Sequence, residues 1–290
     1  MTPLTRDELA DVLGIAGPPG SAPVVARQAP GLDGPVIEVV AGDQVLQCPW
    51  RVPARPNGAT VVLPWYDVDS MFAAMRPEPG LAVQRKKFPV ADELLALGFA
   101  IVVVPWWAEA MGRRSPHADL TGRYGPPAAA MLAAGWRTAL GRSLADVLAV
   151  VELLAQEPAQ EGKLAVWGHS LAGKLSLFSA ALDDRLQACV THELGLGWEH
   201  SNWFEPWYLG EVRPEFDCDA VLALIAPRPV LYGAGHGFDA EPGLTMARSV
   251  RVGDWAPEII EHHAGHRPTE QTRQQTCRWL AERLGVGIAA

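Results

Sequence analysis

Short apolar strands alternate with helical segments along most of the chain, and this alternation limits the possible folds more than any other feature of the sequence. The runs that we read as strands are Val36–Val40, Val45–Val52, Ala59–Leu63, Ala100–Val104, Lys163–Trp167, Leu186–Thr191, Pro229–Tyr232 and Glu258–His262. The helical segments are Arg6–Leu13, Val90–Leu97, Pro126–Gln156, Leu171–Leu182 and Thr269–Leu284. Strands separated by helices pair in parallel and are covered by helices on both faces. The sequence therefore predicts an α/β protein with a mostly parallel central sheet, which binds ligands beyond the carboxyl ends of its strands.

The chain of 290 residues is long enough for one large domain. Residues 1–34 combine a short helical stretch with a Gly- and Pro-rich run, and we read them as a lead-in on the surface. Residues 35–290 then form a single domain. Two of its connections, near 106–126 and 193–219, are longer than usual and leave from predicted strand ends. We expect these two segments to form a cap over the functional site.

Charge and composition exclude several classes of function. The net charge of −9 argues against sequence-independent binding of nucleic acid, which needs a basic surface. The longest nearly apolar run, Leu94–Ala108, has 15 residues and contains Gly98 and Pro105, so it is too short and too broken to cross a membrane. The first residues do not resemble a signal peptide, and the four cysteines are widely separated. We therefore expect a cytoplasmic protein with reduced thiols, and no histidine or cysteine spacing predicts a metal or another cofactor.

A serine between a predicted strand and a predicted helix carries the strongest chemical signal, in the run Gly168-His169-Ser170-Leu171-Ala172-Gly173. A serine on such a sharp turn projects its hydroxyl above the sheet, and the residues around it must be small so that the helix can approach the strand. Gly168, Ala172 and Gly173 meet this requirement. The pattern favours a nucleophile elbow with Ser170 as nucleophile over a plain Gly-Ser turn.

A serine hydroxyl needs a base, and the base needs an acid that orients it. His266 follows the last predicted strand and precedes the final helix, which is the place of the base when the chain order is serine, acid, histidine. Asp239, in the loop after the next-to-last predicted strand, is our first choice for the acid. Glu241 in the same loop and Glu193, which follows the strand before it, are the alternatives.

The developing charge of an acyl-transfer reaction needs two hydrogen-bond donors. Leu171 supplies the first, because its amide follows the nucleophile at the start of a helix. The second should lie in Pro64–Asp67, just after the strand Ala59–Leu63. Tyr66 is our choice for its amide, and its phenol can also reach the oxyanion.

Ser170, Asp239 and His266 in this order, together with the strand pattern, resemble the α/β-hydrolase superfamily over nearly the whole chain from about residue 35. Four stretches are similar to the dienelactone hydrolase and acetylxylan esterase branch, namely Gly168–Lys174, Ala180–Arg185, Ser201–Gly210 and Leu224–Pro229. The chain departs from that pattern after the third strand, where Trp65-Tyr66 stands in place of His-Gly. The resemblance implies a serine hydrolase, often active on small acyl esters, that needs no metal.

We therefore expect a carboxylic-ester hydrolase that cleaves a small-molecule ester through an acyl-enzyme, with a sugar or an aromatic alcohol as its leaving group. Amide or lactone hydrolysis and acyl transfer pass through the same tetrahedral intermediate and are alternatives. A protein of this fold that binds a ligand without catalysis is a further alternative, from another functional class.

The eleven tryptophans of the chain are unusually many, and seven of them fall at or after predicted strand ends. Packing in the core alone would spread them more evenly. We therefore predict an aromatic wall around the substrate. The residues that we expect to line this pocket are Trp65, Trp106, Trp107, His169, Trp198, Trp203 and Trp207.

Overall fold

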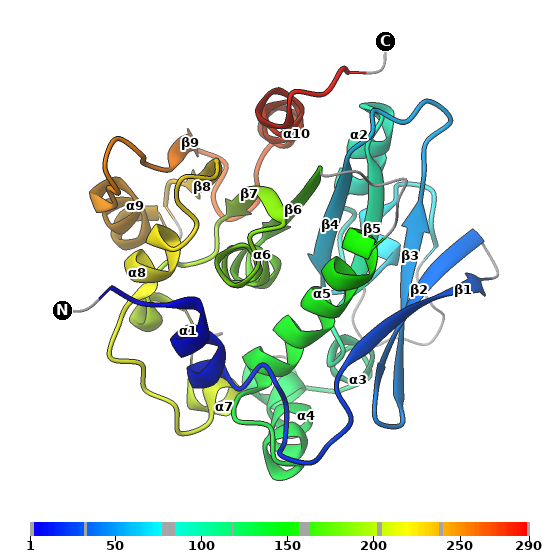
Figure 1. Cartoon of the computed structure of the whole chain (residues 1–290), viewed down its shortest axis with the longest axis vertical. Coiled ribbons are helices and arrows are strands. Elements are labelled where there is room, and N and C mark those ends of the chain that lie inside the picture. Colours follow the sequence, from blue (N-terminus) through cyan, green and yellow to red (C-terminus); the bar gives the residue numbers. More distant parts are fainter. Residues whose placement is uncertain are drawn as a thin grey trace.

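The computed structural model describes residues 3–31, 34–76, 85–117, 119–156, 163–201, 205–237 and 240–288. Within these residues, nine strands form one sheet in the order β1-β2-β3-β5-β4-β6-β7-β8-β9 (Figure 1). Their bounds are β1 Val25–Gly31, β2 Gly34–Ala41, β3 Gln44–Arg51, β4 Thr60–Trp65, β5 Ala100–Pro105, β6 Leu164–His169, β7 Leu186–His192, β8 Val230–Gly235 and β9 Glu258–His262.

The sheet is parallel from β5 to β9 and antiparallel at the β1–β3 end. Strands β4 and β6 are buried along their whole length, which explains why their sequences are continuous apolar runs. The predicted α/β class with a mostly parallel sheet is confirmed. The difference lies at the antiparallel edge, where residues 25–31 of the expected lead-in form β1 and pair with β2. An edge strand tolerates Pro30 and exposed polar residues, so its composition resembles that of a loop.

Helices lie on both sides of the sheet (Figure 1). Helix α5 (Ala139–Gln156) and helix α6 (Leu171–Leu182) pack together on one side, where α1 (Arg6–Leu13) joins them. Helix α2 (Val90–Ala96) packs against α10 (Glu270–Leu284) on the other side. The shorter helices are α3 Glu109–Gly112, α4 Leu120–Ala133, α7 Pro206–Leu209, α8 Cys218–Ala223 and α9 Ala240–Ser249, with 3₁₀ turns η1 Asp69–Met71 and η3 Trp198–His200.

The single helix predicted over Pro126–Gln156 is wrong, because the structure has two helices there. Helix α4 begins earlier, capped by Asp119, whose side chain accepts a 2.7 Å hydrogen bond from the amide of Gly122. The chain then leaves the helical path at Gly135, whose φ of +95° favours glycine, and α5 begins at Ala139. The two consecutive prolines lie inside α4 instead of in its first turn.

No helix of the described residues is long and apolar enough to span a membrane.

The connection between β6 and α6 is the sharpest feature of the sheet's carboxyl edge. Ser170 joins the two elements with φ 60° and ψ −124°, a conformation that L-residues rarely adopt. Gly168 has no space for a side chain, because a Cβ atom there would overlap the carbonyl oxygen of Ala172 and lie 2.5 Å from Ser176 Oγ. The corner therefore forms only when the residue two positions before Ser170 is glycine.

We expect Gly168→Ala to lower the free energy of unfolding by roughly 1–3 kcal/mol, because the added methyl group forces α6 away from β6. Gly287→Ala is the matched control. A Cβ atom at Gly287 would meet nothing within 4 Å, and the φ of this residue is not positive. Urea unfolding measures both variants, and equal stability of the two would show that the corner has free space.

Candidate active site

Ser170 lies at the first turn of α6, where the first amides and the helix dipole favour negative charge. Its own amide donates a 2.9 Å hydrogen bond to the carbonyl oxygen of His192 at the end of β7. The residue is 9% exposed. A hydroxyl group is thus held at a buried corner, with little freedom in the backbone that carries it.

Tyr66, directly after β4, brings its phenol to Ser170. The phenol hydroxyl donates to Ser170 Oγ at 3.2 Å and accepts from the amide of Leu171 at 3.4 Å. Burial raises the pKa of Tyr66, so the phenol stays protonated and can donate at neutral pH. Three of the residues selected from the sequence, Ser170, Leu171 and Tyr66, therefore meet at one point. Tyr66 makes its contacts with Ser170 and Leu171 through its phenol, whereas its amide was our choice from the sequence.

A partly buried ion-pair network contacts the ring of Tyr66. The guanidinium carbon of Arg85 lies 3.7 Å from the centroid of that ring, a cation–π contact. Arg85 donates to both carboxylate oxygens of Glu109, at 2.5 and 3.0 Å, and to the hydroxyl oxygen of Tyr124 at 2.9 Å. Tyr124 in turn donates to Glu109 at 2.7 Å. Because every member has a hydrogen-bond partner, the network can fix Tyr66 without leaving a charge unpaired.

His266 lies in the turn after β9, next to a buried carboxylate. Its Nδ1 is 3.7 Å from Oε2 of Glu193, whose side chain is fully buried, whereas the side chain of His266 is 29% exposed. Glu193 directly follows β7 and has φ +49°. Its amide donates to the carbonyl oxygen of Gly233 at 2.9 Å. A Cβ atom at Gly235 would lie 2.8 Å from Glu193 Oε1, so glycine leaves the room that this carboxylate occupies.

The structure does not describe either of the other two candidates for the acid beside His266. Glu241 has an 80% exposed side chain, and its carboxylate lies 3.9 Å from His236 Nδ1. Asp239 lies outside the described residues. Of the two acidic candidates that the structure describes, Glu193 is the one that lies beside His266. The sequence signal for it is a charged residue that directly follows a strand with a buried end.

Three further histidines form a hydrogen-bonded series below Ser170. His169 Nδ1 and His192 Nδ1 are 3.1 Å apart, and His192 Nε2 and His262 Nε2 are 3.0 Å apart. The sheet register pairs the ends of β6 and β7 so that His169 faces His192. Burial lowers the pKa of His169 and of His192 well below the usual range, and it also lowers the pKa of His262. All three imidazoles are therefore neutral near pH 7.

His192, Glu193 and His262 have ligand atoms within 4.8 Å of one another, which is the spacing of a possible metal site. The hydrogen bonds argue against that use. The amide of Ala264 donates to His262 Nδ1 at 3.2 Å, so the proton of this neutral imidazole lies on Nε2. That nitrogen faces His192 Nε2 as a donor and has no lone pair for a metal ion. The donor set fits a hydrogen-bonded pair of histidines better than a metal centre.

Trp65 packs around the residues that lie next to Ser170. Its ring contacts the rings of Tyr66 and His169, with centroids 5.9 and 6.3 Å apart. Its indole N–H donates to Ser70 at 2.8 Å. Trp65 therefore supports the site from within the protein. Trp203, another member of the predicted aromatic wall, lies outside the described residues.

The remaining tryptophans of the predicted wall also use their polar atoms or rings inside the protein. The indoles of Trp106 and Trp107 both donate to Ser143 Oγ of α5, at 3.1 and 2.9 Å. Trp198 donates to a backbone carbonyl oxygen in the segment before α8 at 2.6 Å. The ring of Trp207 packs on that of the next residue in α7. Their contact with a substrate stays a prediction.

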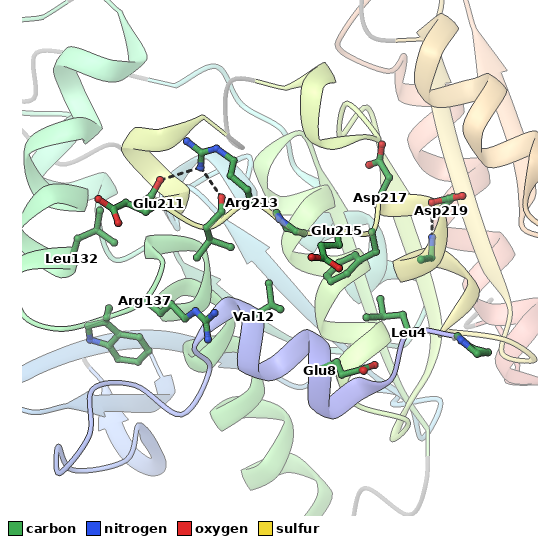
Figure 2. A pocket seen from close by; sticks show the side chains of 17 residues that line it. Leu4, Glu8, Val12, Leu132, Arg137, Glu211, Arg213, Glu215, Asp217 and Asp219 are labelled. Carbon is green, nitrogen blue, oxygen red and sulfur yellow. Dashed lines mark hydrogen bonds between the residues drawn. The ribbon is translucent and has the colours of Figure 1, made fainter. Parts of the chain in front are cut away.

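A groove of about 1520 Å³ lies on another part of the molecule, between α1, α4 and the segment 210–220 (Figure 2). Its described lining includes the carboxylates of Glu8, Glu211, Glu215 and Asp219. Ser170 and the residues that contact it are not among the described residues of this lining. The groove is therefore separate from the serine site.

Comparisons with known proteins agree with this architecture. No family model matches the chain. The putative hydrolase YtaP of Bacillus subtilis (strain 168) is 24% identical over 213 residues, which are 67% of this chain and 68% of that protein. A carbohydrate esterase family 15 glucuronoyl esterase from Caldicellulosiruptor kristjansonii has a TM-score of 0.64 at 16% identity, with 97% of this chain and 84% of that chain covered. The chain has the α/β-hydrolase fold.

Two further structures of this kind extend the comparison. A promiscuous family 15 esterase from a marine bacterial metagenome has a TM-score of 0.61 at 14% identity, covering 96% of this chain and 91% of that one. Methylesterase BT1017 has a TM-score of 0.62 at 15% identity, covering 97% of this chain and 63% of that one. In the α/β-hydrolase fold the corner at Ser170 is the position of the nucleophile elbow. The narrower resemblance to dienelactone hydrolases stays a prediction.

We expect the stability of the protein to fall as the solution is acidified through the range where unfolded histidine titrates. His169 and His192 have lower pKa values in the folded protein than in the unfolded chain, so the unfolded chain binds protons first. Their stabilisation is complete above about pH 6.5 and declines below it, by up to about 1.4 kcal/mol per pH unit for each imidazole.

Urea unfolding of the protein and of His192→Gln between about pH 7.5 and 5.5 measures this effect. The variant should lose less stability on acidification, because one of the two imidazoles is gone. Carboxyl groups such as Asp146, whose pKa burial raises to about 6, are the same in both proteins and cancel in the difference. Equal slopes would contradict this, because they would show that His192 takes up protons in the folded protein as readily as in the unfolded chain.

Proposed function

We propose that the protein is a serine esterase that cleaves a small carboxylic ester through an acyl-enzyme on Ser170. The surroundings of the Ser170 hydroxyl support this proposal most strongly. Its hydroxyl lies at the strained corner before α6, 3.2 Å from a neutral phenol and beside the first amides of a helix. The similarity to structures named as esterases supports the same reaction class.

In the acylation step, Ser170 Oγ attacks the carbonyl carbon of the ester while His266 accepts the hydroxyl proton. The tetrahedral intermediate then collapses with cleavage of the bond between the acyl carbon and the alcohol oxygen. His266 returns the proton to the leaving alcohol. Water attacks the acyl-enzyme in the same way, with His266 as base, and releases the carboxylic acid and the free serine.

The oxyanion is stabilised by the Leu171 amide and the Tyr66 phenol. In the free protein these two groups bond to each other, and the phenol also donates to Ser170 Oγ. The Tyr66 oxygen thus lies between the nucleophile and the amide that would meet the developing charge. When the ester oxygen enters, both N–H and O–H can donate to it. Charge that forms at a buried point is stabilised strongly by donors already in place.

Glu193 is the acid of this triad in our proposal. A carboxylate next to Nδ1 keeps the proton of His266 on that nitrogen, so that Nε2 carries the lone pair that accepts the serine proton. It also stabilises the imidazolium that forms in both steps. The 3.7 Å separation of Glu193 Oε2 and His266 Nδ1, and the burial of this carboxylate, support the assignment over the exposed Glu241.

The substrate that we propose is a small ester with a sugar or an aromatic alcohol as leaving group. The names of the similar structures, glucuronoyl esterase and methylesterase, belong to those proteins and make a sugar-derived ester a reasonable first choice for a screen. The cap over Ser170 formed by segments near 106–126 and 193–219, and the cytoplasmic location, stay predictions.

Ser170→Ala should abolish hydrolysis of a small aryl ester, with a loss of kcat/KM of at least about 10³-fold, because the nucleophile is gone. Circular dichroism and thermal unfolding check that the fold is retained. A fluorophosphonate probe should label the native protein and leave the variant unlabelled. Full activity of the folded variant would rule out the serine mechanism.

Glu193→Gln should lower kcat by about 10²- to 10⁴-fold, because an amide at this position cannot stabilise the imidazolium and permits the wrong tautomer. Asp239→Asn and Glu241→Gln are the matched controls, since each makes the same carboxylate-to-amide change at another acidic candidate. Steady-state kinetics with one aryl ester measures all three. A large loss in Asp239→Asn with none in Glu193→Gln would make Asp239 the acid.

A further inference from the structure

The histidines at the ends of β6, β7 and β9 form a series that is linked by hydrogen bonds between their rings. His169 and His192 meet through their Nδ1 atoms at 3.1 Å, and His192 and His262 meet through their Nε2 atoms at 3.0 Å. All three side chains are buried. The rings of His192 and His262 are stacked, with centroids 5.0 Å apart and planes 4° from parallel. Two hydrogen bonds in series link β9 to the residue before the nucleophile.

One backbone amide sets the direction of the whole series. Ala264 donates its N–H to His262 Nδ1 at 3.2 Å, so the single proton of neutral His262 is on Nε2. That N–H donates to His192 Nε2, which must be unprotonated, and the proton of His192 is therefore on Nδ1. The Nδ1–H group of His192 then donates to His169 Nδ1. The proton of His169 must then be on Nε2.

Two glycines of β8 leave the space that this series needs. A Cβ atom at Gly233 would overlap the ring of His192, and a Cβ atom at Gly235 would lie 2.8 Å from His262 Cε1. In the sheet register Gly233 pairs with His192 and Gly235 pairs with His262. The sequence Gly-Ala-Gly at the end of β8 is thus matched to these two rings, and any larger residue would separate them.

The last ring of the series lies against His266. The centroids of His169 and His266 are 4.7 Å apart, and Phe88 stacks on His169 with centroids 5.2 Å apart. The lone pair of His169 is on Nδ1, where His192 already donates to it. His169 therefore has no lone pair left to accept a proton from Ser170 or His266. A charge on His169 would also oppose the charge that forms on His266.

We propose that His262, His192 and His169 act as positioning residues that lock one neutral tautomer beside His266, so that the proton of Ser170 passes to His266 alone. The kinetic part of this inference rests on the proposed esterase function. The tautomer part does not, because it follows from the hydrogen bonds between the rings. The series acts through His266, which His169 contacts, and its role is to hold and insulate the base.

Nitrogen-15 NMR of the native protein tests the lock directly. Long-range ¹H–¹⁵N correlation spectra distinguish a protonated from an unprotonated ring nitrogen. At neutral pH we expect protons on His262 Nε2, His192 Nδ1 and His169 Nε2. A proton on His169 Nδ1, or a charged ring in the series, would overturn the proposal. This measurement needs no activity and no variant that must fold.

Two substitutions of His192 test the kinetic role. The amide of His192→Gln can accept from His262 and donate to His169, whereas His192→Leu can do neither. We expect the leucine variant to lose roughly 10- to 100-fold in kcat with KM changed by less than about twofold, and the glutamine variant to recover most of this loss. Thermal unfolding of both variants separates a loss of fold from a loss of rate.

A leucine variant with native kcat, or a glutamine variant no better than leucine at equal stability, would overturn the proposal. Failure of the esterase function gives a different result. In that case either the native protein does not hydrolyse the ester or Ser170→Ala keeps the activity, whatever the tautomers are. An inactive Ser170→Ala together with a proton on His169 Nδ1 would leave the esterase intact and remove only the lock.

Discussion

The approach of α6 to the end of β6 is the constraint on which the site depends. Ser170 adopts φ 60° because the chain must turn from strand to helix in one residue, and Gly168 gives the helix its space. The amide of Ser170 bonds to the His192 carbonyl on β7, so the corner is tied to the neighbouring strand. One tight turn thereby aims the hydroxyl, starts the helix that supplies the Leu171 amide, and fixes His169 opposite His192.

Two partly buried polar networks meet at this corner from opposite ends of the parallel sheet region. On one side, Arg85 and Glu109 hold the phenol of Tyr66 against Ser170. On the other, the carboxylate of Glu193 lies beside His266, next to the series of neutral histidines. Burying such groups is unfavourable unless each has a partner. Arg85, Glu109 and Tyr124 meet this requirement by bonding to one another.

The parts of the site that depend on residues close together in the chain can be predicted from the sequence. A glycine two residues before a serine at a strand–helix junction is visible in a linear string, and so are helices such as Arg6–Leu13 and Leu171–Leu182, which the structure confirms. The position of Tyr66 is predicted because a hydrogen-bond donor for the oxyanion is expected directly after β4, the strand that pairs with β6. The phenol's contact with Ser170 depends on its rotamer and on Arg85, which no local pattern reveals.

The parts that sequence could not resolve depend on contacts between distant strands. Glu193 is separated from His266 by two strands in the chain, and only the register of β7, β8 and β9 brings the two side chains together. The histidine series depends on the same register. Strand β1 was hidden by its loop-like composition, and the break between α4 and α5 depends on the positive φ of Gly135. Asp239 and Trp203 lie outside the described residues, so their roles stay predictions.

The most direct measurement is to trap the acyl-enzyme and locate the acyl group. The protein is mixed with an excess of an aryl ester, quenched in acid within the first turnovers, digested and analysed by mass spectrometry. We expect the mass of the acyl group on the peptide that contains Ser170, at the serine itself. Steady hydrolysis with the acyl group on another residue, or with no adduct at any quench time while Ser170→Ala remains active, would contradict a nucleophilic role for Ser170.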